Sequence, residues 1–258
     1  MSDVSTILVD CSGPIMTITI NRPEVLNALD PPSHRQLSEV FDRYAADDDL
    51  RVAIITGSGD KAFCVGSDLK ARAEMGGDDI PATGFAGLTE RFDLLKPVIA
   101  AVNGHAVGGG LEMVLACDLA VAVPNAKFGL PEVKVGLAAS GGLHRMARQL
   151  PMKHVMEIAL TGTLFDADQA MKFGLINRIV EPQDLADTVA SLAEWLLECA
   201  PISVRATKQM IADGLAQPSL QAAFSAGYPV HEEMLASDDA KEGSKAFLEN
   251  RKPEWKNR

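Results

Sequence analysis

Three consecutive glycines and a nearby glutamate are the residues of this chain with the clearest capacity for chemistry. Gly108, Gly109 and Gly110 follow a polar turn and begin a predicted helix, in which Glu112 is a carboxylate among apolar residues. Glycine lets another molecule approach the unpaired N–H groups of a first helical turn, where the positive end of the helix dipole also points. Glu112 follows Gly109 by three residues, so both lie on one side of the helix, one turn apart. The spacing predicts an anion-binding donor and a possible base that face one space.

The elements around this helix read as alternating strands and helices. Short apolar or alternating runs predict strands at residues 7–10, 15–20, 51–56, 98–102, 119–123, 126–129 and 175–180. Helices are predicted at 31–45, where Asp30 is the N-cap and Pro31 begins the first turn, and at 143–149, 153–161 and 166–173. Residues 76–87 are rich in glycine and lack periodicity, which predicts a mobile segment. The pattern beyond Pro182 is helical, so we expect an α/β core followed by a helical C-terminal part.

Composition narrows the classes of partner. The 258 residues include 24 Lys and Arg against 35 Asp and Glu, a formal net charge of −11, so nucleic acid and anionic membranes are disfavoured partners. The four cysteines have neither zinc-ligand spacing nor a Cys-x-x-Cys motif, which indicates free thiols in a reducing compartment. The N-terminus lacks a signal-peptide pattern and no run of eighteen apolar residues occurs, so we expect a cytoplasmic protein.

Three further motifs accompany the glycine triplet: residues 21–29 (NRPEVLNAL), 62–70 (AFCVGSDLK) and 128–132 (FGLPE). In this order and spacing the four motifs resemble the crotonase superfamily, the enoyl-CoA hydratases and isomerases. The resemblance extends over nearly the whole chain, to the tail at 237–243 (SDDAKEG). It implies a crotonase-like α/β spiral of repeated β-β-α units with a helical C-terminal region. Residues 1–182 would form the core with the active site, and residues 183–258 a helical trimerisation or lid region, with trimers often paired into hexamers.

The resemblance also implies roles for individual residues. The backbone N–H groups of Ser67 and Gly109 would form an oxyanion hole for the thioester carbonyl of an acyl-CoA. Two fixed donors stabilise the negative oxygen of a thioester enolate better than mobile water does. Glu112 would be the ionised base that activates water, and Glu132 the protonated acid that supplies the α-proton.

Residues expected by the same resemblance to bind the CoA substrate are Arg22, Ala62, Cys64, Ser67, Asp68, Leu69, Lys70 and Phe247. Asp68 also reads as a helix cap, and Phe247 as a core residue. No metal or other cofactor is expected, because coenzyme A arrives as part of the substrate. Two departures from the family pattern stand out: Glu24 replaces a lysine that holds CoA phosphates in many relatives, and residues 136–142 (GLAASGG) are about one residue short and lack a proline. The second departure leaves the acyl group open.

The expected function is that of an enoyl-CoA hydratase, which adds water reversibly and syn to a 2-enoyl-CoA thioester with two glutamates and a backbone oxyanion hole. A different reaction of the same family is the first alternative: isomerase, decarboxylase, thioester hydrolase or dehydratase of a special acyl group. A non-catalytic acyl-CoA-binding protein is the second alternative, and an RNA-binding relative, disfavoured by the acidic charge, is the third.

Overall fold

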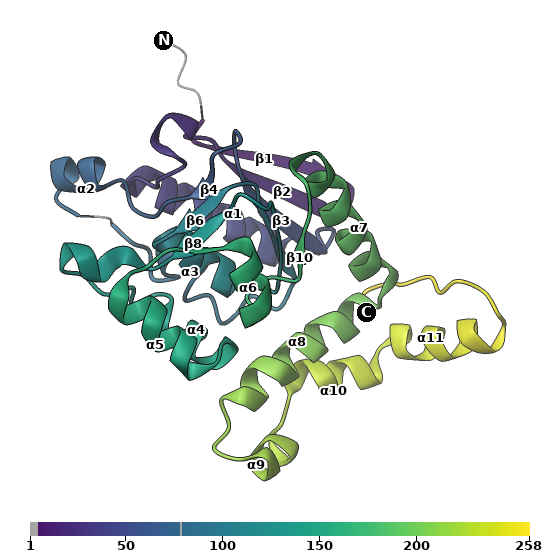
Figure 1. Ribbon diagram of the computed structural model, residues 1–258. Coiled ribbons are helices and arrows are strands. Elements are labelled where there is room, and N and C mark those ends of the chain that lie inside the picture. Colours follow the sequence, from purple (N-terminus) through teal and green to yellow (C-terminus); the bar gives the residue numbers. More distant parts are fainter. Residues whose placement is uncertain (1–4, 78) are drawn as a thin grey trace.

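Two β-sheets form the centre of the protein in the computed structural model, which describes residues 5–77 and 79–258 (Figure 1). The larger sheet has the strand order β1-β2-β3-β5-β7-β10. Its strands are β1 (Ile7–Ser12), β2 (Ile15–Ile20), β3 (Val52–Gly57), β5 (Val98–Val102), β7 (Leu119–Ala122) and β10 (Arg178–Ile179). The smaller sheet has the order β4-β6-β8-β9, from β4 (Ala62–Cys64), β6 (His105–Val107), β8 (Lys127–Gly129) and β9 (Phe165–Asp166).

The two sheets are built by a repeated β-β-α unit. β3, β5 and β7 each enter the larger sheet, and the next strand along the chain, β4, β6 or β8, enters the smaller one. A helical segment then returns the chain: α2 (Leu69–Met75), α3 (Gly109–Ala116) and the 3-10 helix η3 (Pro131–Val135). Within each sheet the strands of successive units pair in parallel. The predicted spiral of β-β-α units is thereby confirmed.

The core of the larger sheet follows from its apolar runs. All five residues of β5 are buried, and β5 is paired on both edges, with β3 and β7. A strand covered on both faces is expected to be apolar throughout, and the run at 98–102 has that composition. The antiparallel β1–β2 hairpin closes one edge of this sheet, with Ser12 opposite Ile15.

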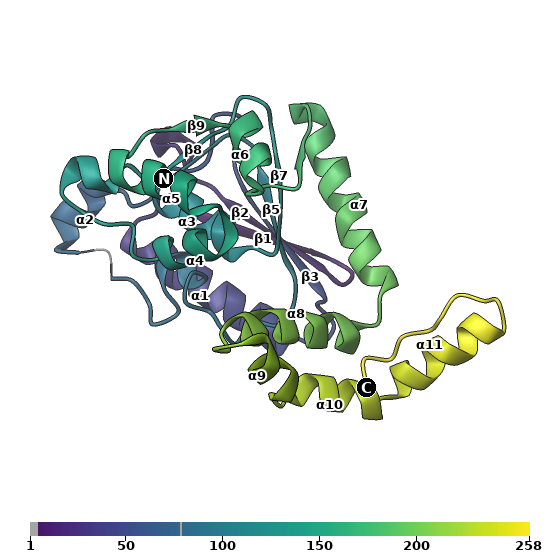
Figure 2. The same ribbon diagram turned by 60° about the horizontal axis from the view of Figure 1, so that its bottom comes forward.

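Two long helices cover the larger sheet, which lies between them in Figure 2. α1 (Pro31–Ala46) begins at Asp30, whose side chain accepts a hydrogen bond from the backbone N–H of Ser33 as predicted. Its buried face includes Phe41 and Tyr44, and the Tyr44 hydroxyl donates to the carbonyl of Pro97 at 2.7 Å. α7 (Leu185–Glu198) packs against β3, β5 and β7.

Three shorter helices follow the smaller sheet: α4 (Leu143–Gln149), α5 (Met152–Thr161) and α6 (Ala167–Phe173). Their positions agree with the sequence prediction. Asp166 caps α6 in a capping box with Gln169. Among the helices of the described chain, none is long and apolar enough to cross a membrane.

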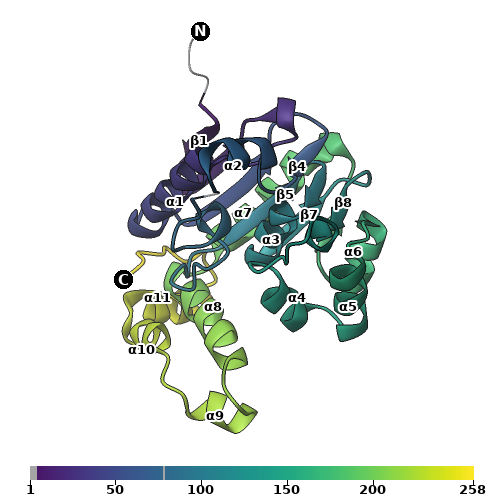
Figure 3. The same ribbon diagram turned by 90° about the vertical axis from the view of Figure 1, so that its left-hand side faces the viewer.

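The last four helices project away from both sheets, as all three views show (Figure 3). They are α8 (Pro201–Leu215), α9 (Leu220–Ser225), α10 (Pro229–Ala236) and α11 (Asp238–Leu248). α10 packs against α8 and α11. Lys208 ties α8 to the core, because its ammonium group donates to Asp118 at 2.7 Å and to the carbonyl of Lys96 at 3.0 Å.

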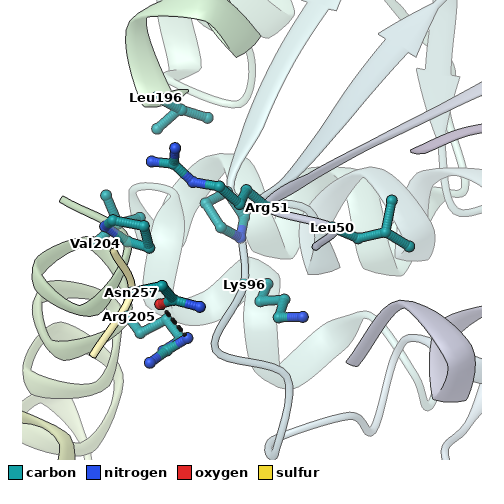
Figure 4. Close-up of a pocket in the computed structure, with 9 residues that line it drawn as sticks. Leu50, Arg51, Lys96, Leu196, Val204, Arg205 and Asn257 are labelled. Atoms are coloured by element: carbon teal, nitrogen blue, oxygen red, sulfur yellow. Dashed lines mark hydrogen bonds between the residues drawn. The ribbon is translucent and has the colours of Figure 1, made fainter. Parts of the chain in front are cut away.

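A cavity of about 20 Å³ marks the joint between the core and this helical part (Figure 4). Three basic residues, Arg51, Lys96 and Arg205, line it, and their charged ends point away from one another. Arg205 bonds to Asn257 of the C-terminal tail at 3.0 Å, while Lys96 donates to the carbonyls of Tyr44 and Asp47. A space of this size holds about one water molecule, so we interpret the cavity as a small gap in the packing between the core and the C-terminal helices.

Several short elements differ from the sequence prediction. Residues 105–107, expected in a polar turn, form β6, and residues 62–64, for which no strand was predicted, form β4. The strand predicted at 175–180 is reduced to Arg178–Ile179, and β1 continues to Ser12 rather than ending at residue 10. The segment predicted to be mobile contains a buried 3-10 turn, η2 (Phe85–Gly87), which packs on α1; residue 78 of that segment lies outside the described residues.

Candidate active site

Each glycine of the triplet faces a different close neighbour. A Cβ at Gly110 would overlap with the carbonyl oxygen of Cys64 in β4, and one at Gly109 would overlap with the ring of Phe85. Gly108 has a φ of +59°, and a Cβ there would lie 3.1 Å from Oε1 of Glu132. Only glycine fits these three positions without displacing the backbone or side chain beside it.

The N–H groups of Ser67 and Gly109 lie on two segments that touch. Gly66 has a φ of +94°, and a Cβ there would lie 3.1 Å from the backbone nitrogen of Gly109. Leu29 holds both neighbours of Ser67, since its N–H donates to the carbonyl of Gly66 and its carbonyl accepts from the N–H of Asp68, each at 2.8 Å. In this parallel pairing the N–H of Ser67 points away from Leu29. Gly109 is the first residue of α3, so its N–H has no acceptor within the helix.

Glu112 is buried at the wall of the same space, with 6% of its surface exposed. Its side chain lies against two glycines: a Cβ at Gly141 would be 3.0 Å from Oε2, and one at Gly142 would be 3.4 Å from Oε1. Burial and the nearby charge of Glu132 raise the pKa of Glu112 to about 7, although the N–H groups of both glycines favour the ionised form. Glu112 therefore changes its protonation close to neutral pH.

Glu132 approaches from the other side, on η3 directly after Pro131. Burial raises the pKa of this carboxyl above its usual range. Oε2 of Glu132 and Oε1 of Glu112 are both buried, and neither finds a hydrogen-bond partner among the described residues. Two carboxyls that share a pocket resist ionising together, so the pair holds a proton more tightly than either acid would in water.

Arg22 and Asp68 form an ion-paired cluster beside residues 65–68, which join β4 to α2. The guanidinium of Arg22 lies 3.0 Å from Asp68 and 3.2 Å from Asp30, and it donates to the carbonyl of Ala28. Asp68 also accepts from the N–H of Ala71, so it caps α2, and these donors hold its pKa below the usual range. The structure therefore places the charge of Arg22 against two carboxylates.

The other residues expected to bind CoA fall into two groups. Ala62 and Cys64 are buried in β4, and the side chains of Asn27 and Asn103 donate to the carbonyl of Ala62. Leu69 and Lys70 are exposed at the start of α2.

Phe247 is not brought to this site within one chain. It is 82% exposed on α11, and Figure 1 shows α11 and α2 at opposite ends of the molecule. It is also not a core residue, which corrects the alternative reading of its sequence position.

Residues near the site that sequence reasoning missed come from the segment before β5. Phe85 packs edge-on against His34 at a centroid distance of 4.6 Å, and its ring covers Gly109. The N–H of Ala86 donates to Nδ1 of His34 at 3.1 Å, which anchors the turn to α1. Thr89, two residues beyond this turn, is also buried. The one available signal was the apolar sequence at residues 85–88 inside an otherwise glycine-rich stretch.

No group of three or more His, Cys, Asp and Glu side chains that could hold a metal ion occurs within residues 5–77 and 79–258. Acidic residues at the site occur as the pair Glu112 and Glu132. The arrangement supplies two backbone donors on adjoining segments and two carboxyls with raised pKa values, a set suited to proton transfer next to a carbonyl whose oxygen becomes negative.

This chain is similar to known proteins in sequence and in structure. The curated carnitinyl-CoA dehydratase of Citrobacter koseri is 44% identical over 252 residues, which cover 95% of this chain and 96% of that protein. The protein of the same name from Proteus mirabilis is 43% identical over 257 residues, with the same coverage.

Solved structures agree with these relatives. An enoyl-CoA hydratase from Mycobacterium marinum is 40% identical, has a TM-score of 0.92 and matches over 98% of this chain and 99% of its own. A carnitinyl-CoA hydratase from Mycobacterium avium is 39% identical, has a TM-score of 0.77 and matches over the same shares. The sequence profile described as enoyl-CoA hydratase/isomerase matches residues 10–258. The chain therefore belongs to the enoyl-CoA hydratase/isomerase family of the crotonase superfamily.

Proposed function

We propose that this protein is a hydro-lyase that adds water reversibly, and syn, to the double bond of a 2-enoyl-CoA thioester. The observation that carries the proposal is the pair of carboxyls, buried Glu112 and half-buried Glu132, each with one buried oxygen, beside the N–H groups of Ser67 and Gly109. Hydration has to remove a proton from water and deliver one to the α-carbon, which is work for two acid–base groups. A reaction of the family that only moves a proton between two carbon atoms could use a single acid–base group.

In the proposed reaction, Glu112 accepts a proton from water as the water oxygen bonds to the β-carbon. The electrons of the double bond move toward the thioester carbonyl, and the resulting oxyanion accepts hydrogen bonds from Ser67 and Gly109. Glu132 then gives its proton to the α-carbon. Dehydration follows the same steps backwards, so one carboxyl must be ionised and the other protonated in either direction.

The substrate is proposed to be an acyl-CoA, with no metal or separate cofactor. Exposed Lys70 is the better candidate for a contact with CoA phosphates, because Arg22 is already neutralised by Asp30 and Asp68. Ala62 and Cys64 would contribute indirectly, because they form β4, the strand that leads to Ser67.

A carnitinyl-CoA dehydratase reaction is the second candidate, carried by the names of the relatives that are 43–44% identical. A carnitinyl group bears a hydroxyl at the β-carbon and a quaternary ammonium at the γ-carbon. The exposed carboxylate of Glu90 lies near enough to raise the pKa of Glu112, so a cationic acyl group would meet negative charge at this end of the site. The same chemistry, loss of water from a 3-hydroxyacyl-CoA, serves both candidates.

We further propose that residues 183–258 take part in assembly as a trimer or a dimer of trimers. Large apolar side chains on α8, α9 and α11 are exposed, among them Leu215 at 70%, Phe224 at 82% and Phe247 at 82%. Apolar groups of this size are normally covered in a soluble assembly. In such an assembly Phe247 would contact the substrate of a neighbouring chain rather than its own.

The test is a panel of acyl-CoA thioesters followed by mass spectrometry. It should contain short, long and aromatic 2-enoyl-CoAs, their 3-hydroxy partners and a 3-hydroxyacyl-CoA with a quaternary ammonium at the γ-carbon. Hydration adds 18 Da and dehydration removes it, whereas isomerisation leaves the mass unchanged, decarboxylation loses CO₂ and thioester hydrolysis frees CoA. Binding of acyl-CoA without turnover of any panel member would identify a non-catalytic binding protein and overturn the proposal.

A further inference from the structure

Thr89 carries a buried hydroxyl in the wall of the active site. Its side chain is 2% exposed, and its Oγ1 has no hydrogen-bond partner among the described residues. A buried hydroxyl without a hydrogen-bond partner destabilises the folded protein. Its presence therefore indicates either that it bonds to a bound molecule or that the methyl group of the side chain is needed for packing. Glu112 and Glu132, nearby, each have a buried oxygen that also lacks a hydrogen-bond partner among the described residues.

The geometry around Gly141 brings Thr89 and Glu112 together. A Cβ at Gly141 would lie 3.0 Å from Oε2 of Glu112 and 3.2 Å from Oγ1 of Thr89. Both oxygens therefore border one small space above this glycine, and a side chain at position 141 would enter it. A water molecule bound in protein needs two to four polar partners, and this space offers them from two directions.

The hydroxyl of Thr89 is held in place by its surroundings. The carbonyl of Thr89 accepts two hydrogen bonds from the guanidinium of Arg145, at 3.0 and 3.2 Å. Its N–H donates to the carbonyl of Phe85 at 3.3 Å, within the turn that covers Gly109. Gly84 leaves room for the side chain, since a Cβ there would overlap with Oγ1. Thr89 is thus tied to the same buried turn that packs on the glycine triplet.

We propose that Thr89 is a catalytic residue whose Oγ1 donates a hydrogen bond to the oxygen of the reacting water. A threonine hydroxyl has one donor and two acceptor positions, whereas an ionised carboxylate only accepts. The proton of Glu132 is destined for the α-carbon, so Thr89 supplies a separate donor that fixes the water oxygen while ionised Glu112 takes one of its protons. In dehydration Glu132 takes the α-proton, the same Thr89 donor binds the β-hydroxyl oxygen as its bond to carbon breaks, and protonated Glu112 gives this oxygen the second proton with which it leaves as water.

This inference rests on the proposed hydro-lyase function and extends it to the substrate. It predicts a preference for acyl groups with a hydroxyl at the β-carbon in the dehydration direction. A reaction that moves only protons between carbon atoms would gain nothing from the Thr89 hydroxyl.

The test compares Thr89→Val, which keeps the shape and removes the hydroxyl, with Thr89→Ser, which keeps the hydroxyl. With the best substrate of the acyl-CoA panel, Thr89→Val should lower kcat about 10- to 100-fold, the effect of losing one hydrogen bond to a reacting group, and leave KM within about threefold. Thr89→Ser should retain most of the activity. The matched control is Thr83→Val on the same segment, where the hydroxyl bonds to Ser38 at 3.0 Å; its kcat should stay within about twofold of the parent.

Two results would overturn the role of Thr89: an unchanged kcat in Thr89→Val, or a Thr89→Ser protein as slow as Thr89→Val, which would indicate packing alone. Should Thr89→Val fail to fold, Thr89→Ala removes the hydroxyl without adding atoms and is compared with Thr89→Ser in the same way. The parent protein separates this inference from the proposed function. A parent that neither hydrates nor dehydrates any thioester defeats the function, whereas an active parent with an active Thr89→Val variant defeats only the inference.

Discussion

The two ends of this chain use apolar side chains in opposite ways. In the sheet core, Phe41, Phe63 and Phe128 are fully buried, whereas Phe224 on α9 and Phe247 on α11 are each 82% exposed. The core therefore buries most of its aromatic rings, although Phe92 there is 79% exposed. The exposed apolar side chains of the C-terminal helices support the proposal that these helices serve assembly while the core serves the chemistry.

Asp118 is among the residues that connect the two parts. Its carboxylate accepts from the N–H of Val98, at the start of the strand that leads to the site, and from Lys208 of α8. The salt bridge to Lys208 is partly exposed, so we expect it to contribute little to the free energy of unfolding. We therefore expect substitutions in the core to change the turnover rate, and substitutions on α8–α11 to change the mass of the assembled protein.

The largest effect is expected from Glu112→Gln and Glu132→Gln. Each amide keeps the size of the side chain but can neither accept nor supply the proton, so turnover should fall about 10²- to 10⁴-fold while the thioester still binds. Steady-state rates and calorimetric titration with a substrate-like CoA ester measure the two quantities. Glu157→Gln, an exposed position on α5, is the control and should match the parent. Full turnover in either active-site variant would refute the assigned roles.

A somewhat smaller loss is expected from Gly109→Ala. The added Cβ would overlap with the ring of Phe85, so the start of α3 must shift and its N–H would leave the position that the oxyanion requires. Removal of one such donor costs about 10²- to 10³-fold in kcat. The substitution Gly174→Ala, at a helix C-cap where a Cβ meets open space, controls for the loss of a glycine, although its φ of +81° adds local strain. If Gly109→Ala turned over normally, the N–H of Gly109 would not be part of the oxyanion hole.

The pH dependence of stability should expose the buried charge of Glu112. Its pKa in the folded state, about 7, lies above the ordinary value of 4.5, so its stabilising contribution is complete below pH 4.5 and is lost as the pH rises through 7. Glu112→Gln lacks this loss and should be the more stable protein at pH 8, by up to about 3 kcal/mol, with the gap closing toward pH 4.5. Denaturant unfolding at a series of pH values measures it. A gap that stays constant with pH would contradict the raised pKa.

The smallest effect on the core is expected from the double substitution Leu215→Glu and Phe224→Glu. These side chains are 70% and 82% exposed, so a charge there should change the free energy of unfolding of one chain by less than about 1 kcal/mol. It should, however, reduce the assembled mass in sedimentation or light scattering, because a buried interface would have to hold unpaired charges. Leu69→Glu, exposed on α2, serves as a charge control on the core. An unchanged mass would show that α8 and α9 are not part of an interface.

The parts of the fold that sequence predicted well have local causes. The apolar run at 98–102 forms a buried strand because each residue meets a neighbour on both faces, and Asp30 begins α1 because its side chain and the following prolines fit a first turn. The three-residue strands β4 and β6 were missed, since they pair with each other from residues 43 positions apart and carry no periodicity of their own. The strand predicted at 175–180 is reduced to Arg178–Ile179, where it pairs with β7, and the apolar residues Leu175 and Ile176 are buried just before it.

The candidate site likewise contains residues that the sequence pointed to and residues that only the structure shows. The resemblance located Glu112, Glu132, Ser67 and Gly109, and the fold brings their segments together. It could not locate Thr89, because the property that singles out this residue is an unpaired hydroxyl beside Gly141, more than fifty residues later in the chain. The same holds for the neutralisation of Arg22, which depends on Asp68 approaching from the next unit of the spiral.

The glycine triplet also limits how this protein could be redesigned. At positions 109 and 110 an added Cβ would overlap with a neighbour, and at position 108 it would lie close to Glu132 on a backbone with a φ of +59°. A change of the proposed acyl group is therefore poorly served by these three positions. Thr89, Gly141 and Gly142 border Glu112 from other segments, so libraries at residues 84–92 and 136–142 would vary this wall and leave the proposed thioester-binding backbone untouched.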